Sequence, residues 1–227
     1  MLLSVIITTK NRYNDLLECI QSIHDSKWLD FEYEILVIDD LSSDNTQNLT
    51  PKDFKIPNVR IIHNEIHQMM VKSRNIWINN SNWEYLLFVD DDNIVHQDMI
   101  KILMDFIIQQ KNPTIIWPSI AYNDCKEKYF FWQKISFFSG KTYNVSDRQS
   151  KAIHTDWIPN VFLIPREIFQ KTWNFDEDMV QTFTEPDFYF NAQKRIWCQA
   201  YIINDAITYH KVSKKDKFNP RWLWWQY

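Results

Sequence analysis

The sharpest chemical feature of the sequence is a run of three adjacent carboxylates, Asp90-Asp91-Asp92, followed by Asn93. The run comes directly after an apolar segment at residues 85–89, which is typical of a buried strand. Adjacent carboxylates repel one another, and Mg²⁺ or Mn²⁺ relieves that repulsion while its other positions bind phosphate oxygens. Alternatively, these acids cap a helix predicted at about 97–110, because negative charge stabilises a helix N-terminus.

A second acidic pair, Asp39-Asp40, ends the apolar segment at 32–40 and precedes the turn-forming residues 41–46. A carboxylate at the end of a strand can accept a hydrogen bond from a base or a ribose. A capped turn accounts for the polar residues after the pair but not for the pair itself. Arg12 and Arg74 are the cationic candidates for binding a phosphate or a base edge.

The elements that would position these residues alternate between strand and helix. Apolar runs predict strands at 2–9, 32–40, 58–63, 85–89, 114–117 and 198–208, with aromatic and polar residues alternating over 127–165. Apolar periodicity and capping residues predict helices at about 14–26, 66–79, 97–110, 165–171 and 185–195, the first capped by Asn14 or Asp15. This order predicts an α/β fold with a Rossmann-like central mixed, mostly parallel sheet flanked by helices. Both acidic clusters then lie at the carboxyl edge of the sheet, where such folds bind ligands.

Composition excludes several classes of protein. The chain has 227 residues and a single glycine, Gly140, where an average chain would have roughly fifteen. Glycine-rich phosphate loops and the GxSxG elbow are therefore absent. A net charge of −4 gives a nucleic-acid partner no electrostatic support. Three scattered cysteines, no signal-peptide pattern and no long apolar run lead us to expect a cytoplasmic protein.

Five segments, taken together and in this order, resemble family 2 glycosyltransferases of the GT-A fold. They are SVIITTKNR (4–12), EILVIDDLSSDNT (34–46), KSRNIWINNSNWEYLLFVDDDN (72–93), NFDEDM (174–179) and TEPDFYFNAQKRIW (184–197). The resemblance implies a single GT-A domain over 1–213, with a nucleotide-binding half at 1–112 and an acceptor-binding half at 113–213. Residues 214–227 form an aromatic and basic tail.

The resemblance also implies roles for individual residues. Thr8 and Asp40 match positions that contact the nucleotide base, and Arg74 matches one that contacts base or phosphate. Asp92 matches the direct metal ligand, with Asp90 or Asp91 near the ribose. His210 matches a histidine that often lies near the metal or the diphosphate.

The catalytic base is implied by a segment that reads E-D-x-D-L in the family. Here Thr184-Glu185-Pro186-Asp187-Phe188 places Glu185 at the position of the base, with Asp187 as the alternative. A carboxylate within hydrogen-bond reach of an acceptor hydroxyl can do this chemistry. Otherwise both residues are only first-turn acids of a helix. The chain departs from the family at Pro159-Asn160-Val161, where glycine is common, and at 194–197, where K-A-G-Y is usual.

The resemblance leads us to expect a glycosyltransferase that inverts configuration and depends on Mn²⁺ or Mg²⁺. Its donor would be a UDP- or GDP-type sugar, and its acceptor a hydroxyl of a glycan, a lipid-linked or a protein-linked molecule. A non-catalytic nucleotide-sugar-binding protein of the same fold is one alternative, and another Mg²⁺-dependent nucleotide-sugar enzyme is a second. The lack of a glycine-rich loop and of aspartates after the first strand disfavours nucleotidyltransferases and DxDxT phosphatases.

The C-terminal tail, residues 214–227, combines basic residues with five aromatic ones. Tryptophan and tyrosine favour membrane interfaces and bases favour anionic lipid, so the tail is a candidate for peripheral membrane contact. Alternatively, its aromatic residues pack on the protein's own surface or on the second subunit of a homodimer.

Overall fold

The computed structural model describes residues 2–27, 32–81, 83–124, 126, 133–135, 142–144, 150–179 and 184–211. The first half contains β1 (Leu2–Thr9), α1 (Tyr13–His24), β2 (Glu32–Asp39), η1 (Asn45–Asn48), η2 (Pro51–Phe54), β3 (Val59–His63), α2 (Met69–Asn80), β4 (Tyr85–Phe88), β5 (Asn93–Val95) and α3 (Met99–Ile107). The second half contains β6 (Thr114–Tyr122), β7 (Gln133–Ile135), β8 (Thr142–Asn144), β9 (Ala152–His154), β10 (Phe162–Pro165), α4 (Arg166–Lys171), α5 (Thr184–Ile196) and β11 (Gln199–His210).

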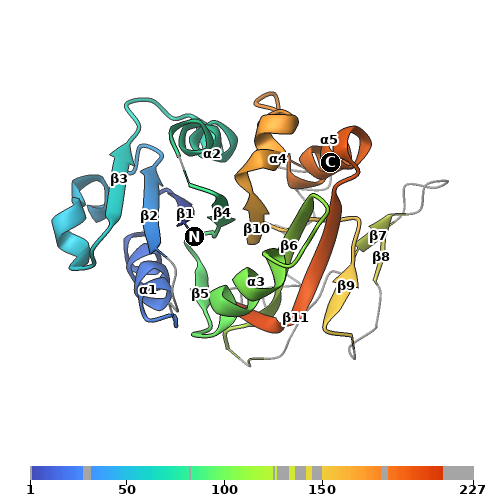
Figure 1. Cartoon of the computed structure of the whole chain (residues 1–227). Coiled ribbons are helices and arrows are strands. Elements are labelled where there is room, and N and C mark those ends of the chain that lie inside the picture. The colour runs from blue at the N-terminus through green and yellow to red at the C-terminus, as the bar shows by residue number, and fades with distance from the viewer. Residues whose placement is uncertain are drawn as a thin grey trace.

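A nine-stranded sheet runs through both halves of the chain in the order β3-β2-β1-β4-β10-β6-β11-β5, with β9 paired to β11 (Figure 1). Strands β1, β2, β3, β4, β6 and β11 run in one direction, and β5, β9 and β10 run in the other. The predicted α/β class and its mixed, mostly parallel sheet are therefore confirmed. The short hairpin β7–β8 forms a separate two-stranded sheet.

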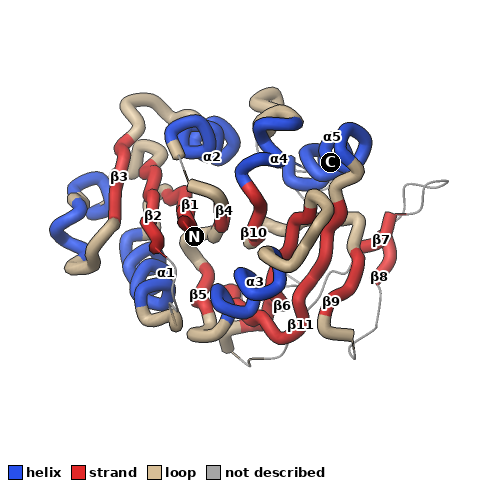
Figure 2. Tube along the Cα trace, in the orientation of Figure 1, coloured by secondary structure: helices blue, strands red, loops and turns tan. Residues whose placement is uncertain are grey.

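Helices cover both faces of the large sheet (Figure 2). On one face α1 and α3 pack against side chains such as Val5, Val37 and Leu87. On the other face α2, α4 and α5 pack against their neighbours in sequence, such as Ile6, Leu36 and Phe88. This period-two alternation of fully buried residues explains why the strands read as continuous apolar runs.

The structure departs from the expected local elements at two points. The first is the cap of α1, because the helix begins at Tyr13 and neither Asn14 nor Asp15 precedes it. Instead, the backbone N–H of Tyr13 donates to Asp44 Oδ2 at 3.1 Å, so the cap comes from the turn after β2. The second is β5, a strand that was not expected, which pairs with β11 before the expected helix begins as α3.

The scarcity of glycine leaves left-handed backbone positions to other residues. Asn11 and Asn58, at φ 55° and 64°, use the residue type that tolerates this region best after glycine. Bulkier residues occupy others, including Met69 at φ 65° and Trp197 at φ 56°. Trp197 follows α5 as an αL cap, in which its backbone N–H donates to Gln193 O at 3.0 Å.

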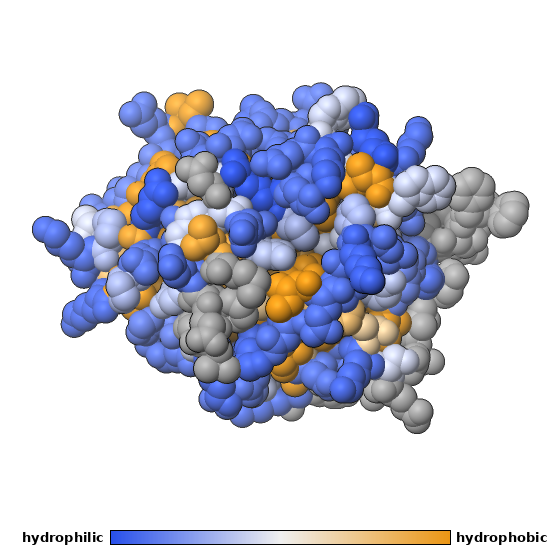
Figure 3. All heavy atoms as spheres, in the orientation of Figure 1, coloured by the Kyte–Doolittle hydropathy of each residue, from blue (hydrophilic) through white to orange (hydrophobic). Residues whose placement is uncertain are grey.

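Hydrophilic residues cover most of the molecular face in Figure 3, with apolar residues scattered among them. Among the residues that the structure describes, no helix is long and apolar enough to cross a membrane. The tail at 214–227 lies outside those residues.

Candidate functional site

A cavity of about 290 Å³ lies where β1, β2 and β4 reach their carboxyl ends. It is lined by Thr8, Thr9, Lys10, Arg12, Asp40, Met69, Met70, Asp90, Asp91 and Asp92. Parallel strands bring their ends to one edge, which explains how Thr9 and Asp91, 82 positions apart in sequence, meet here. Six of the ten predicted site residues, namely Thr8, Arg12, Asp40, Asp90, Asp91 and Asp92, line this single cavity.

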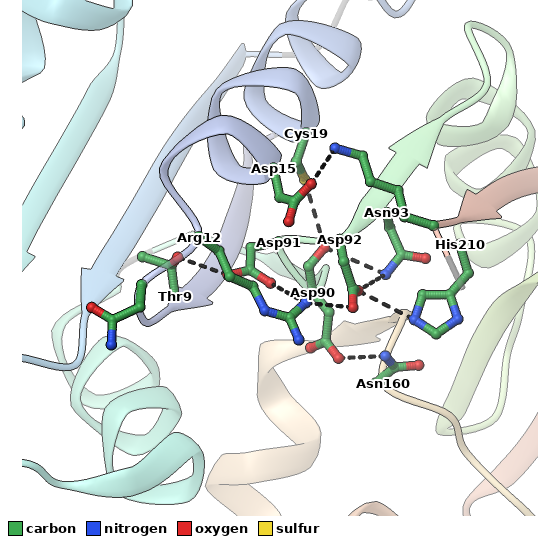
Figure 4. A network of polar contacts seen from close by, with 12 residues as sticks. Thr9, Arg12, Asp15, Cys19, Asp90, Asp91, Asp92, Asn93, Asn160 and His210 are labelled. Atoms are coloured by element: carbon green, nitrogen blue, oxygen red, sulfur yellow. Dashed lines mark hydrogen bonds and ion pairs between the residues drawn. The ribbon is translucent and has the colours of Figure 1, made fainter. Parts of the chain in front are cut away.

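Arg12 neutralises part of the acidic run (Figure 4). Its Nη1 lies 2.6 Å from Asp92 Oδ2 and 3.3 Å from Asp91 Oδ1, and Thr9 Oγ1 donates to Asp91 Oδ2 at 2.7 Å. Burial raises the pKa of Asp91 to about 7, although Thr9 and Arg12 oppose that rise. The carboxyl group of Asp91 therefore binds a proton more readily than an ordinary aspartate.

Asp92 behaves in the opposite way to Asp91. Burial works against its charge, yet the imidazole of His210 and the guanidinium of Arg12 lower its pKa to about 2. His210 Nε2 lies 3.3 Å from Asp92 Oδ1 because β11 ends beside the turn after β4. The predicted pair of Asp92 and His210 is thus brought together.

The donor atoms fit a metal ion that is shared with a ligand rather than enclosed by protein. Asp92 and His210 supply one carboxylate and one imidazole, with side chains 16% and 19% exposed. Within the described part of the chain, no group of three or more His, Cys, Asp or Glu side chains is placed to hold a metal. Mg²⁺ and similar ions commonly bind one or two carboxylates and complete their shell with phosphate oxygens and water.

Arg74 connects Asp90 to Glu185, which lies 111 positions away from Arg74 along the chain. Its Nη1 donates to Glu185 Oε1 at 2.5 Å and its Nη2 to Asp90 Oδ1 at 3.0 Å. Asn160 donates to the other oxygen, Asp90 Oδ2 (Figure 4). Burial raises the pKa of Asp90, and the Arg74 charge opposes that rise without cancelling it. Glu185 is thereby held beside the acidic run.

Both carboxylate oxygens of Asp40 have hydrogen-bonding partners within the protein itself. Its Oδ1 accepts the backbone N–H of Gln68 at 2.7 Å and its Oδ2 that of Met69 at 2.9 Å, which caps the start of α2. Asn64 Nδ2 donates to Oδ1 at 3.0 Å, and His67 Nδ1 lies 2.6 Å from Oδ2. Burial alone would raise the pKa of Asp40, but these partners keep it below its ordinary value.

Asp187, the alternative base, lies apart from the acidic run. It accepts a hydrogen bond from Asn191 at 3.1 Å, one turn further along α5. It lines a separate cavity of about 560 Å³ between α2, α5 and residues 173–177. Of the two acids in this segment, Glu185 is the one that is linked through Arg74 to Asp90, which lines the 290 Å³ cavity.

Sequence reasoning missed several members of the site. Thr9 and Lys10 stand next to predicted residues at the end of β1, so their position carried a signal. Asn160 was visible only as a departure from the resembled family. Asn64 and Met69 carried no signal, because their roles depend on how the α2 N-terminus approaches β2.

Comparisons with known proteins identify the family and the fold. The family model described as "Glycosyl transferase family 2" matches residues 4–173. An uncharacterized glycosyltransferase of Rickettsia felis is 32% identical over 62% of this chain, which spans 23% of that protein. Glycosyltransferase GlyG of Streptococcus pneumoniae is 25% identical over 91% of the chain and 69% of its own length. The crystal structure of GalNAc-T7 with UDP, GalNAc and Mn²⁺ superposes with a TM-score of 0.76 at 14% identity, over 93% of this chain and 44% of that one.

Proposed function

The chain belongs to glycosyl transferase family 2, and from that premise we propose that it transfers a sugar from a UDP-sugar to a hydroxyl acceptor with inversion of configuration. The choice of UDP is supported by the fold neighbour GalNAc-T7, whose structure holds UDP and Mn²⁺. The cavity at the carboxyl ends of β1, β2 and β4 is the proposed donor site.

On the donor side, Asp92 and His210 would hold a divalent ion, Mn²⁺ or Mg²⁺. When bound, such an ion neutralises the diphosphate and stabilises it as a leaving group. Lys10 and Arg12 border the same cavity and supply further positive charge for phosphate oxygens. Thr8 and Asp90 or Asp91 are the proposed contacts of the base and the ribose.

On the acceptor side, Glu185 is the proposed general base. It removes the proton of the acceptor hydroxyl as that oxygen attacks the anomeric carbon from the face opposite the nucleotide. The bond to the acceptor forms while the bond to the diphosphate breaks, so a single displacement inverts the configuration. Glu185 is 8% exposed, so its carboxylate is largely shielded from bulk water.

The observation that carries this proposal is the Arg74 bridge between Glu185 and Asp90. A base must lie close to the anomeric carbon, and that carbon is attached to the diphosphate that the acidic run faces. Because one guanidinium binds both carboxylates, Glu185 stays close to Asp90 in the wall of the donor cavity. The same bridge disfavours Asp187, whose hydrogen bond is to Asn191 instead.

The proposal is tested by measuring UDP and GDP release from a panel of sugar nucleotides with Mn²⁺ or Mg²⁺, with and without hydroxyl acceptors. We expect UDP release from at least one donor, and an anomeric configuration in the product opposite to that of the donor. Retention of the donor's anomeric configuration in the product would exclude the single-displacement mechanism. No release and no binding of UDP or GDP would remove the function altogether.

A further inference from the structure

Arg74 stands at the point where the donor side and the acceptor side of the site meet. The resemblance to family 2 glycosyltransferases implies that Arg74 contacts the base or the phosphate of the donor. We propose instead that Arg74 is a positioning residue, which fixes the carboxylate of Glu185 relative to the donor cavity and does not contact the donor. This inference rests on the function proposed above.

Burial is the first argument. The Arg74 side chain is 2% exposed, and Arg74 is not among the residues that line the donor cavity. Its Cζ lies 5.5 Å from the ring centroid of Phe88, so one face of the guanidinium packs on the core. A residue that bound phosphate would have to present its N–H groups to the cavity. Arg12, by contrast, is 46% exposed and does line the cavity.

The direction of the hydrogen bonds is the second argument. Nη1 and Nη2 of Arg74 point to different carboxylates, at 2.5 Å to Glu185 and 3.0 Å to Asp90. The planar guanidinium keeps its N–H groups in fixed directions, which a flexible ammonium cannot do. Each of the two terminal nitrogens therefore already has an anionic partner, and the angle between the partners is set by the rigid fork.

The anchoring of Asp90 is the third argument. Asn160 donates to Asp90 Oδ2 while Arg74 donates to Asp90 Oδ1, so both oxygens of this carboxylate are engaged. Asp90 is therefore held in place by two partners, and Arg74 in turn holds Glu185 in a fixed position relative to Asp90. Misplacement of a reacting group by about 1 Å can cost about 100-fold in rate, so such an anchor affects the chemical step.

The test compares Arg74→Lys and Asn160→Ala with the wild type in three measurements: kcat and KM for the donor, the Kd for UDP with Mn²⁺, and the melting temperature. Arg60→Lys is the control for the same substitution outside the donor cavity, because Arg60 pairs with a carboxylate, Glu34, and lies over a ring, Trp77, on a more exposed part of the molecule. Asn160→Ala leaves the guanidinium in place and remains informative if Arg74→Lys does not fold.

We expect Arg74→Lys to lower kcat at least about tenfold, and Asn160→Ala to lower it less. Because Asp90 is a candidate contact of the ribose, the Kd for UDP should change as well, but by a smaller factor than kcat. Arg60→Lys should change neither quantity. A tenfold weaker Kd for UDP with kcat retained would overturn the inference in favour of a donor contact. A folded Asn160→Ala enzyme with wild-type kcat would also count against the anchor.

The Glu185→Gln background separates positioning from a merely structural role. If Arg74 acts through Glu185, adding Arg74→Lys to Glu185→Gln should lower the residual rate less than about twofold. An equal loss in both backgrounds would show that Arg74 acts independently and would overturn the inference alone. A wild type that binds UDP but transfers no sugar would instead remove the proposed function, and this inference with it.

Discussion

Replacing Asp40 by Asn is expected to destabilise the protein by releasing the start of α2. The Asp40 carboxylate is 5% exposed and accepts the N–H groups of Gln68 and Met69 on different oxygens. An Asn side chain can accept only one of these bonds and turns an NH₂ group toward the other donor. Losing one hydrogen bond to a charged acceptor costs about 1.5–3 kcal/mol, and losing a helix cap costs about 0.5–2 kcal/mol. The two ranges count the same contact and are not added, so we expect the free energy of unfolding to fall by about 2 kcal/mol.

The expected loss depends on pH in a defined direction. Since the pKa of Asp40 is lowered in the folded state, its carboxylate stabilises the protein above its unfolded pKa of about 3.9. That contribution disappears as the pH falls through the folded value. The difference in stability between wild type and Asp40→Asn should therefore be constant between pH 7 and 5 and shrink below about pH 4.

Urea unfolding at pH 7, 5 and 3.5 measures this difference, which corresponds to about 4–8 °C in melting temperature at neutral pH. The control is Asp105→Asn, the same substitution at a half-exposed residue that pairs with Lys101 one turn away on α3. It should change the free energy of unfolding by less than about 0.5 kcal/mol. The reasoning fails if the two variants are equally stable at pH 7, or if the difference grows as the pH falls.

Three further outcomes follow from single contacts. Trp197→Gly should raise the free energy of unfolding by about 0.5–1 kcal/mol in urea, because glycine removes the left-handed strain at φ 56° and the lost side chain is 84% exposed. Phe175→Ala should lower it by about 3–5 kcal/mol in the same assay, whereas Phe190→Ala, at a 40% exposed ring, should cost far less. Asp92→Asn should abolish the gain in UDP affinity on adding Mn²⁺ in calorimetry, and an undiminished gain would exclude Asp92 as a metal ligand.

Much of the fold could be predicted because its signals are local. Runs such as 2–9 and 32–39 are apolar enough to be buried on both faces, and this identifies parallel strands without knowledge of the partner. Strand β5 was missed because three residues, Asn93–Val95, carry too little pattern. The cap of α1 was missed for another reason: Asp44 is 31 residues from Tyr13, and only the tertiary fold brings them together.

For the site, too, some features could be predicted from the sequence and others could not. Asp90, Asp91 and Asp92 could be singled out because three carboxylates after a buried strand need a positive charge nearby. We expected a divalent ion to supply it, and in the structure Arg12 and Arg74 lie against these carboxylates. What each residue contacts was not predictable. Asp40 caps α2 through its carboxylate, because the helix N-terminus approaches the end of β2 at that point.

The central claim is that this chain transfers a sugar with Glu185 as the base, and Glu185→Gln tests it most directly. Glutamine keeps the length of the side chain and can still accept from Arg74, but it cannot take a proton from a hydroxyl. We predict that kcat for transfer from a UDP-sugar falls at least about 100-fold while the Kd for UDP stays within about twofold of wild type. A Glu185→Gln enzyme that keeps the wild-type kcat would contradict the claim.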